Sequence, residues 1–223
     1  AYNHLIKTQV VNASNAVFRK PAPPGVAIFS FGAPARNEMV GRSDADIAIY
    51  RACNSTEEIT FKEYVIKSLQ DFGFTKIDTA IGGTANDLKS HMRTSVIETN
   101  MVIESQFICG DICLGDKIEQ LRSELYDPAA IARNLAFQFF YFKQYFDKKA
   151  SADHQNLKYC NGGTRDLLFP IWYAHLKKGI ARGLQISALE RGLNALEEDA
   201  LLSQEEIVST LRASSAMRII RAE

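Results

Sequence analysis

The segments of this 223-residue chain that can form β-strands are confined to its first half. A stretch rich in Pro and Gly at 21–25 breaks the chain, and Val26 to Phe31 follows it as a β-type run that ends at Gly32. Two further strands are expected over 44–50 and 75–81. No later segment alternates convincingly with period two, so any sheet has to be built from the first half of the chain.

Helical patterns surround these strands and fill the rest of the sequence. Ser55 and Glu58 have the form of a capping box that opens a helix ending near Phe72. The chain is therefore expected to form an α/β domain over 1–115 and an all-α domain over 116–223. The helices are expected at 3–19, 33–40 (a short helix or turn), 55–72, 86–108, 127–148, 165–178, 186–198 and 204–220.

The composition is that of a soluble globular protein, with 46% hydrophobic and 23% charged residues. Lys+Arg and Asp+Glu both number 26, so no net charge draws the chain to nucleic acid, and a long polynucleotide partner is not expected. No uncharged run approaches the roughly 20 residues of a membrane span, so no membrane partner is expected. The four cysteines show no CxxC spacing, and buried free thiols in a reducing cytoplasm are preferred over disulfides or a zinc site.

Asp44 and Asp46 lie two residues apart in the second expected strand. Alternate residues of a strand point to one face, so both carboxylates should project together while Ala45, Ile47 and Ile49 face the core. Neighbouring carboxylates repel each other, and a bound divalent cation relieves that repulsion. Mg²⁺ (or Mn²⁺) is the expected ion, because it favours carboxylate oxygens and often lies between a protein and substrate phosphates. Taken alone, however, an ordinary exposed strand edge explains the pair better.

The turn upstream changes that balance. Gly32 permits a tight turn into a short helix, where free backbone N–H groups can hold a phosphate. The residues FGAPARNE from Phe31, followed by SDAD from Ser43, resemble the F-G-S-x-A-R-x-E…S-D-x-D signature of the DNA polymerase β-like nucleotidyltransferases, without a gap. One position departs from it, because Ala33 stands where the family usually has a Ser that helps to hold the triphosphate.

This resemblance implies an α/β (α+β) nucleotidyltransferase fold with a small mixed sheet, followed by a helical domain. It also implies a third carboxylate on an adjacent strand, for which Asp78 is the candidate beside Asp44 and Asp46 as catalytic and metal-binding residues. An ordinary exposed strand Asp is nearly as good an explanation of Asp78. Glu98 and Glu104 are weaker candidates, expected to face outward from the long helix or to pair locally.

The same signature implies which residues meet the nucleotide. Gly32, Ala33 and Ser43 are the expected nucleotide-binding residues of the first domain. Arg36 and Glu38 are expected to brace the turn rather than to touch the substrate.

Two later stretches resemble a narrower group. Residues 93–111 are similar to the helix, ending in x-x-G-D, of the PII-protein uridylyltransferases. Residues 156–167 resemble their N-x-K-x-x-x-G-G-x-R-D-[IL] motif, which glutamine-synthetase adenylyltransferases also carry in a close version. Lys158 and Arg165 of this motif are further nucleotide-binding candidates, because Arg can make a forked contact with phosphate and Lys a point contact. A purely structural link through Arg165 and Asp166 is equally compatible with the residues.

These residues together predict an Mg-dependent nucleotidyltransferase. It would move a nucleoside monophosphate from an NTP (ATP or UTP) to an acceptor hydroxyl, expected on a regulatory protein in the cytoplasm. One alternative is a catalytically degenerate nucleotide-binding regulatory module, which Ala33 favours and the retained Asp pair disfavours. Another is a nucleotidyltransferase acting on a small molecule or RNA, against which the motif at 156–167 speaks.

Overall fold

The contacts of the chain divide it into two compact units, Ala1–Tyr126 and Asp127–Glu223. The sequence places the boundary near residue 115, which falls inside helix α6 (Ile112–Glu124), and α6 packs on the sheet of the first unit. The computed structural model describes residues 2–21, 23–36, 39, 44–53, 55–79, 81–94, 96–133, 136–137, 140, 166–178 and 188–222.

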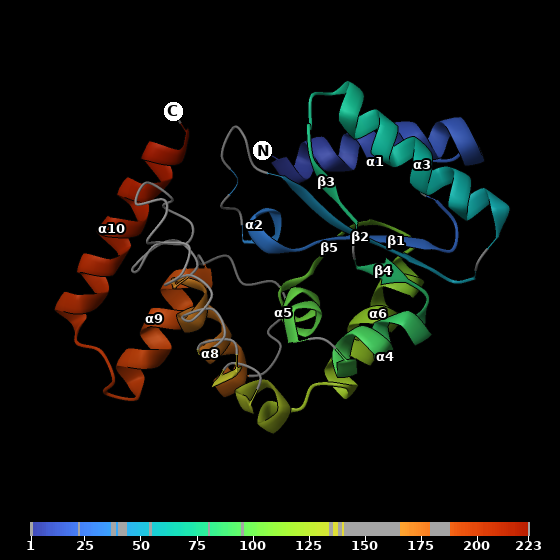
Figure 1. Cartoon of the computed structure of the whole chain (residues 1–223). Helices are drawn as coiled ribbons and strands as arrows, with labels where there is room; N and C mark the ends of the chain where they lie inside the picture. The colour runs from blue at the N-terminus through green and yellow to red at the C-terminus, as the bar shows by residue number, and fades with distance from the viewer. Residues whose placement is uncertain are drawn as a thin grey trace. The chain divides into compact units, whose positions relative to one another are not determined.

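The first unit is built on a five-stranded mixed sheet, so the chain has an α+β fold there (Figure 1). The central strand β1 (Val26–Ser30) pairs antiparallel with β2 (Ala45–Arg51) on one side and β5 (Gln106–Gly110) on the other. β3 (Ile77–Asp78) and β4 (Gly82–Gly83) pair in parallel with the beginning and the end of β2. All five residues of β1 are buried, because helices cover both faces of the sheet.

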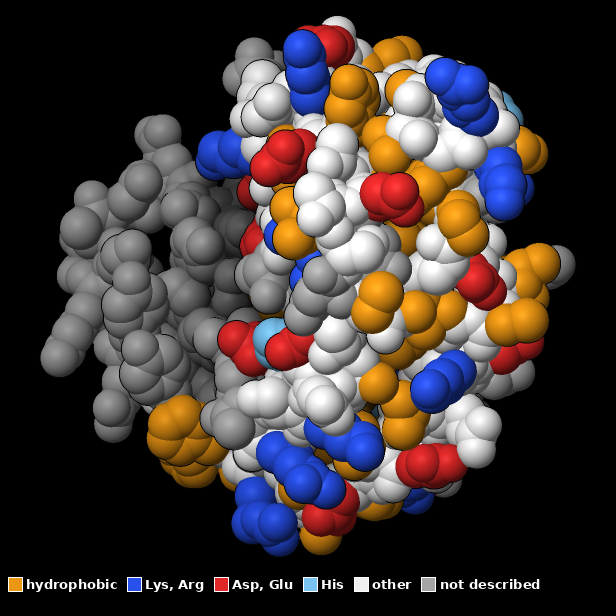
Figure 2. Space-filling model, turned by 90° about the vertical axis from the view of Figure 1, so that its right-hand side faces the viewer, with side chains coloured by type: hydrophobic (Ala, Val, Ile, Leu, Met, Phe, Trp, Pro, Cys, Tyr) orange, Lys and Arg blue, Asp and Glu red, His pale blue; other side chains and the backbone are white. Residues whose placement is uncertain are grey.

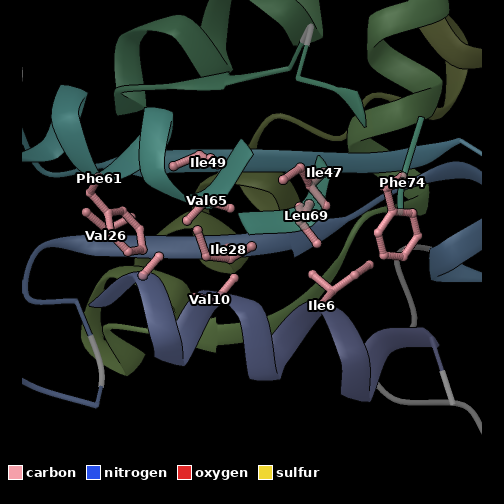
Figure 3. Close-up of a cluster of buried hydrophobic side chains, with 12 residues drawn as sticks. Ile6, Val10, Val26, Ile28, Ile47, Ile49, Phe61, Val65, Leu69 and Phe74 are labelled. Atoms are coloured by element: carbon pink, nitrogen blue, oxygen red, sulfur yellow. The ribbon is translucent and has the colours of Figure 1, made fainter. Parts of the chain in front are cut away.

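Helices α1 (Tyr2–Phe18) and α3 (Thr56–Asp71) cover one face of the sheet (Figure 1). Their apolar stripes pack against alternate residues of β1 and β2 (Figure 3). Gly73, two residues beyond α3, has a φ of 108° and ends the helix as the sequence predicts. The fully or largely buried members of this cluster are Ile6, Val10, Ala13, Val26, Ile28, Ala45, Ile47, Ile49, Phe61, Val65, Leu69 and Phe74.

Helices α4 (Ala85–Thr94), α5 (Val96–Glu104) and α6 lie against the opposite face (Figure 1). There Phe29 of β1 packs edge-on against Tyr50 of β2 and Phe107 of β5, with ring centroids 5.4 and 5.5 Å apart. Aromatic packing thus joins the three central strands on this face.

Asp111 fixes the start of α6 to the start of β1. Its carboxylate accepts hydrogen bonds from the N–H of Gly25 at 3.0 Å and of Leu114 at 3.1 Å. These hydrogen bonds, which favour the charged form, hold the pKa of Asp111 below its usual value. The residue is therefore an N-cap of α6 that also anchors a loop 86 residues away in the sequence.

Two expectations for this unit are wrong. The sequence predicts one helix over 86–108, whereas the structure has α4, α5 and then β5 there, because pairing of β5 with β1 overrides the local helical pattern. The sequence also predicts a strand over 75–81 and a turn at Gly82–Gly83, whereas among the described residues of 75–81 the strand comprises Ile77–Asp78, and the two glycines form β4. A Cβ on Gly82 would lie 2.6 Å from the carbonyl oxygen of Ile49, so glycine is what lets β4 approach β2.

The second unit consists of helices among its described residues. Asp127 caps a helix that starts at Pro128, as predicted, by accepting the N–H of Ala129 at 2.9 Å. The capping box predicted at Ser203 and Glu206 is confirmed by reciprocal hydrogen bonds. The following helices are α8 (Leu168–Lys178), α9 (Ala188–Glu198) and α10 (Gln204–Ala222), with a core of Ile171, Trp172, Leu189, Leu193 and Ile207.

Membrane spans, surface charge and cysteine burial can each be compared with what the composition predicts. None of the helices in the described ranges is long and apolar enough to cross a membrane. On the face shown in Figure 2, Lys and Arg side chains are interspersed with Asp and Glu, and hydrophobic side chains lie between them. Cys53 and Cys113 are free but exposed, so the expectation of buried thiols is wrong for both. Cys109 is partly buried, and burial raises its pKa to about 12.

We expect Gly192→Ala to destabilise the second unit. The backbone of Pro170 and Ile171 in α8 occupies the place of a Cβ at Gly192 of α9, so alanine must push the two helices apart. Such overpacking costs about 1–3 kcal/mol and should outweigh the roughly 1 kcal/mol by which alanine favours a helix. The measurement is urea denaturation followed by the fluorescence of Trp172, the single tryptophan of the chain. Glu198→Ala, an exposed change on the same helix, should shift the free energy of unfolding by less than about 0.5 kcal/mol. Equal effects of the two changes would contradict the close crossing.

Candidate functional site

The candidate site lies where β1 turns into the short helix α2 (Gly32–Ala35), beside the start of β2 (Figure 1). The N–H of Phe31 donates to the carbonyl oxygen of Asp46 at 3.1 Å, which joins the turn to β2. Gly32 follows with a φ of 62°, in the left-handed region. A Cβ at Gly32 would lie 2.6 Å from Oδ2 of Asp46. The Asp46 carboxylate therefore packs directly on the Gly32 backbone, and a side chain at position 32 would displace it.

The two faces of β2 have different surroundings. Ala45, Ile47 and Ile49 lie in the core beneath α1 and α3, which confirms the orientation predicted for these three residues. Asp46 occupies the intervening position, so its side chain points to the other face, and it is partly exposed. Asp44 lies directly before β2 and is also partly exposed.

Strand β3 brings Asp78 beside Asp46. The two residues are Cα partners in the parallel β2–β3 pair, and neighbouring strands lie roughly 4.8 Å apart. Ile77 packs against the core cluster on the α1 and α3 side, so Asp78, at the next position, points to the same face as Asp46. Two acidic side chains thus lie side by side on one face of the sheet, where their negative charges repel each other.

The chemistry of these side chains fits a hard cation. Asp44, Asp46 and Asp78 offer the carboxylate oxygens that Mg²⁺ and Mn²⁺ prefer. Within the part of the chain that the structure describes, no three His, Cys, Asp or Glu side chains come close enough together to hold a metal ion. The donor set therefore fits an ion that takes a pair of protein carboxylates and draws most of its ligands from water and substrate phosphate, as Mg²⁺ commonly does.

Three of the predicted nucleotide-binding residues, Ser43, Lys158 and Arg165, lie outside the described residues. Glu38, predicted to brace the turn, also lies outside them. Ala33 lies in α2 and is partly exposed. Because α2 has only four residues, it adds little macrodipole, and a phosphate at this turn would be held by individual backbone N–H groups.

The residue that directly follows the turn forms an ion pair whose acidic partner the sequence interpretation missed. Arg36, the residue that follows α2, pairs with Glu104, the last residue of α5, and their side chains are 12% and 6% exposed. The expectation that Glu104 faces outward or pairs locally is wrong, because its partner lies 68 residues away. A carboxylate at a helix C-terminus is unfavourable by itself, but the helix predicted over 86–108 did not place Glu104 at an end.

Glu98, the other weaker candidate, lies on helix α5 and contacts residues away from the acidic pair. Its carboxylate lies 2.7 Å from Nδ1 of His91 in α4, and Nε2 of His91 lies 3.4 Å from the carbonyl oxygen of Gly82. Gly82 pairs with Ile49, three residues along β2 from Asp46. Glu98 thus pairs locally, as predicted, and holds α4 to α5 rather than joining the acidic pair.

Tyr50 shares the face of β2 that carries Asp46 but takes no part in the candidate site. Its side chain is fully buried, and the hydroxyl has no hydrogen-bond partner among the described residues. Burial raises the pKa of Tyr50 far above its usual value, so the hydroxyl stays protonated. Tyr50 is therefore a core residue, whereas Asp46, at the start of the same strand, is partly exposed.

Comparison with known proteins adds no family assignment. No model of a known protein family matches the chain, and a search of curated proteins finds no significant match. The interpretation of the site therefore rests on its residues and their geometry.

We expect Gly32→Ala to destabilise the first unit more than Gly73→Ala does. Both glycines have a positive φ, for which an L-residue costs about 1–2 kcal/mol, but only at Gly32 would the new Cβ meet another group, the Asp46 carboxylate. A Cβ at Gly73 meets nothing within 4 Å. The contact is with the end of a side chain that can turn aside, so it should add up to about 1 kcal/mol to the loss at Gly32. Urea denaturation followed by circular dichroism measures both changes, with Trp172 fluorescence identifying the transition of the second unit. A loss at Gly32 no larger than at Gly73 would show that Asp46 does not pack on the turn.

Proposed function

We propose that the first unit catalyses the Mg²⁺-dependent transfer of a nucleoside monophosphate from ATP or UTP to an acceptor hydroxyl. The observation that carries the proposal is the pairing of Asp46 with Asp78 on one face of the sheet, with Asp46 packed on the Gly32 turn. The resemblance of residues 31–46 to the nucleotidyltransferase signature supports it independently. A nucleotidyltransferase-type fold and a cytoplasmic location are parts of the same proposal.

The acidic residues would hold the metal. Asp46 and Asp78 would bind Mg²⁺ directly, with Asp44 beside them as the third acidic residue of the proposed metal site, and the ion would supply positive charge to the triphosphate and to the departing pyrophosphate. Gly32 and Ala33 would offer backbone N–H groups to the phosphates, with glycine allowing the close approach. The remaining predicted contacts, from Ser43, Lys158 and Arg165, belong to the proposal as further nucleotide-binding groups.

The reaction is an in-line displacement at the α-phosphorus. The acceptor hydroxyl oxygen forms a bond to this phosphorus, while the bond from phosphorus to the oxygen that bridges to the β-phosphate breaks. Pyrophosphate leaves with that electron pair. Asp78 accepts the hydroxyl proton, and the acceptor oxygen becomes a bridging oxygen of a phosphodiester that keeps one negative charge. We place the acceptor hydroxyl on a protein, because the motif at 156–167 resembles that of protein-modifying uridylyl- and adenylyltransferases.

A second candidate function is a nucleotide-binding regulatory module without catalysis. One observation favours it: Ala33 lacks the hydroxyl that the signature usually provides. The close acidic pair argues against it, because a binding module that lacks a metal has little use for two repelling carboxylates.

We expect Asp46→Asn and Asp78→Asn to abolish transfer without unfolding the chain. The purified chain is incubated with each α-labelled NTP, Mg²⁺ and a cell lysate, and labelled protein is counted. Each change removes one negative charge from the metal-binding pair but keeps the side-chain shape, so labelling should fall by about 100-fold or more. EDTA should remove it in the unaltered protein.

Asp116→Asn is the matched control, because it neutralises an exposed acid on α6. Its labelling should stay within about twofold of the unaltered chain. Nucleotide binding without labelling under any NTP and metal would favour the regulatory module. The absence of both labelling and binding would contradict the two functions together.

A further inference from the structure

Glu104 occupies a position that is electrostatically poor for the helix that carries it. It is the last residue of α5, where the partial negative charge of the helix end opposes a carboxylate. Its side chain is only 6% exposed, so water does little to offset the charge. A neutral residue would serve α5 better. The ion pair with Arg36, the residue that follows α2, offsets this unfavourable position of the Glu104 charge.

Arg36 connects this ion pair to the candidate site. Its backbone N–H donates to the carbonyl oxygen of Gly32 at 3.2 Å and closes the single turn of α2. Gly32 in turn carries the Asp46 carboxylate on its backbone. A shift of the Arg36 side chain therefore moves the turn on which Asp46 packs.

The other side of the ion pair is held firmly. Arg122 of α6 is 4% exposed and donates to the carbonyl oxygen of Val102 at 3.2 Å, to Oγ of Ser105 at 3.1 Å and to the Ser105 carbonyl oxygen. The residues that accept these hydrogen bonds, Val102 and Ser105, flank Glu104 in the sequence. The end of α5 is thereby fixed to α6, and Glu104 presents its carboxylate to Arg36 from a rigid support.

We infer that Glu104 is a positioning residue for the candidate site, which acts through Arg36 to hold the α2 turn against Asp46. Its consequence for catalysis rests on the proposed function. The effect of Glu104 on the α2 turn does not rest on the proposed function, and it can be measured without an activity assay. Removing the charge of one member weakens a buried ion pair, so the turn should loosen when Glu104 loses its charge.

The test is amide hydrogen exchange, measured by NMR on the full chain and on Glu104→Gln. The Arg36 amide, which closes α2, should exchange about tenfold faster in the variant. The Phe31 amide, bonded to Asp46 in the sheet, should stay within about twofold, which distinguishes local loosening from global destabilisation. Glu98→Gln is the matched control, because it neutralises another paired acid on α5, one that pairs with His91 of α4.

Two further variants keep the inference testable if Glu104→Gln does not fold. Arg36→Lys keeps the positive charge but loses the fork, and should speed exchange of the residue 36 amide by about threefold. The double change Arg36→Glu with Glu104→Arg restores an ion pair, and should return this exchange to within about threefold of the unaltered chain. Unchanged exchange in Glu104→Gln, or in Arg36→Lys where the former does not fold, would overturn the inference. A charge swap that folds and exchanges as fast as Glu104→Gln would do the same.

A kinetic measurement separates this inference from the proposed function. In the labelling assay, Glu104→Gln should lower kcat about tenfold and change the KM for NTP less than threefold, because a displaced Asp46 affects the reacting geometry more than binding. Glu98→Gln should change neither. If the unaltered chain transfers no nucleotide, the proposed function fails, and the exchange measurements still decide whether Glu104 positions the turn.

Discussion

A shift of one residue between β1 and β2 would carry Asp46 into the core and Ile47 out to solvent, because the side chains of a strand alternate between its faces. The observed register pairs Ser30 with Ile47 and continues into the hydrogen bond from Phe31 to Asp46. The apolar residues that face α1 and α3 hold this register, since any slip exposes them. The core and the candidate site therefore depend on the same pairing, and the hydrophobic effect fixes the place of the acidic side chain.

The carboxylates of Asp46 and Asp78 repel each other, and other interactions in the first unit have to offset that repulsion. Two carboxylates roughly 5 Å apart repel by on the order of 1–3 kcal/mol, depending on how well water screens them. Asp46 and Asp78 are partly exposed at the end of the sheet, where water and cations reduce that term. At the end of the α2 turn, Arg36 and Glu104 form the opposite arrangement, a pair of unlike charges that is nearly shielded from water. The unit thus places like charges where solvent or a cation can screen them and unlike charges where it cannot.

Local patterns in the sequence were sufficient to predict α1, β1, β2, α3 and both ends of α10, because neighbouring residues set the periodicity and the caps of these elements. Asp78 was found as an interruption of an apolar run, which is also a local signal. The failures share one cause. Residues 106–110 form a strand only because β1 lies beside them, and Glu104 turns inward only because Arg36 is present. Neither partner is near in sequence, so no local pattern could have indicated them. Lys158 and Arg165 stay predictions.

The small size of α2 explains why the site needs support from outside. A single helical turn fixes several backbone angles for one hydrogen bond, and is not stable alone. Its shape must therefore come from its two ends, the Phe31 N–H bonded to β2 and the Arg36 guanidinium paired with α5. Ala33 offers no polar side chain, so any phosphate contact at this turn depends on backbone N–H groups whose direction these two anchors set. A chain with the same two aspartates and glycine but without the Arg36–Glu104 pair would have the same acidic chemistry and would lose one of the two anchors that hold the turn against it.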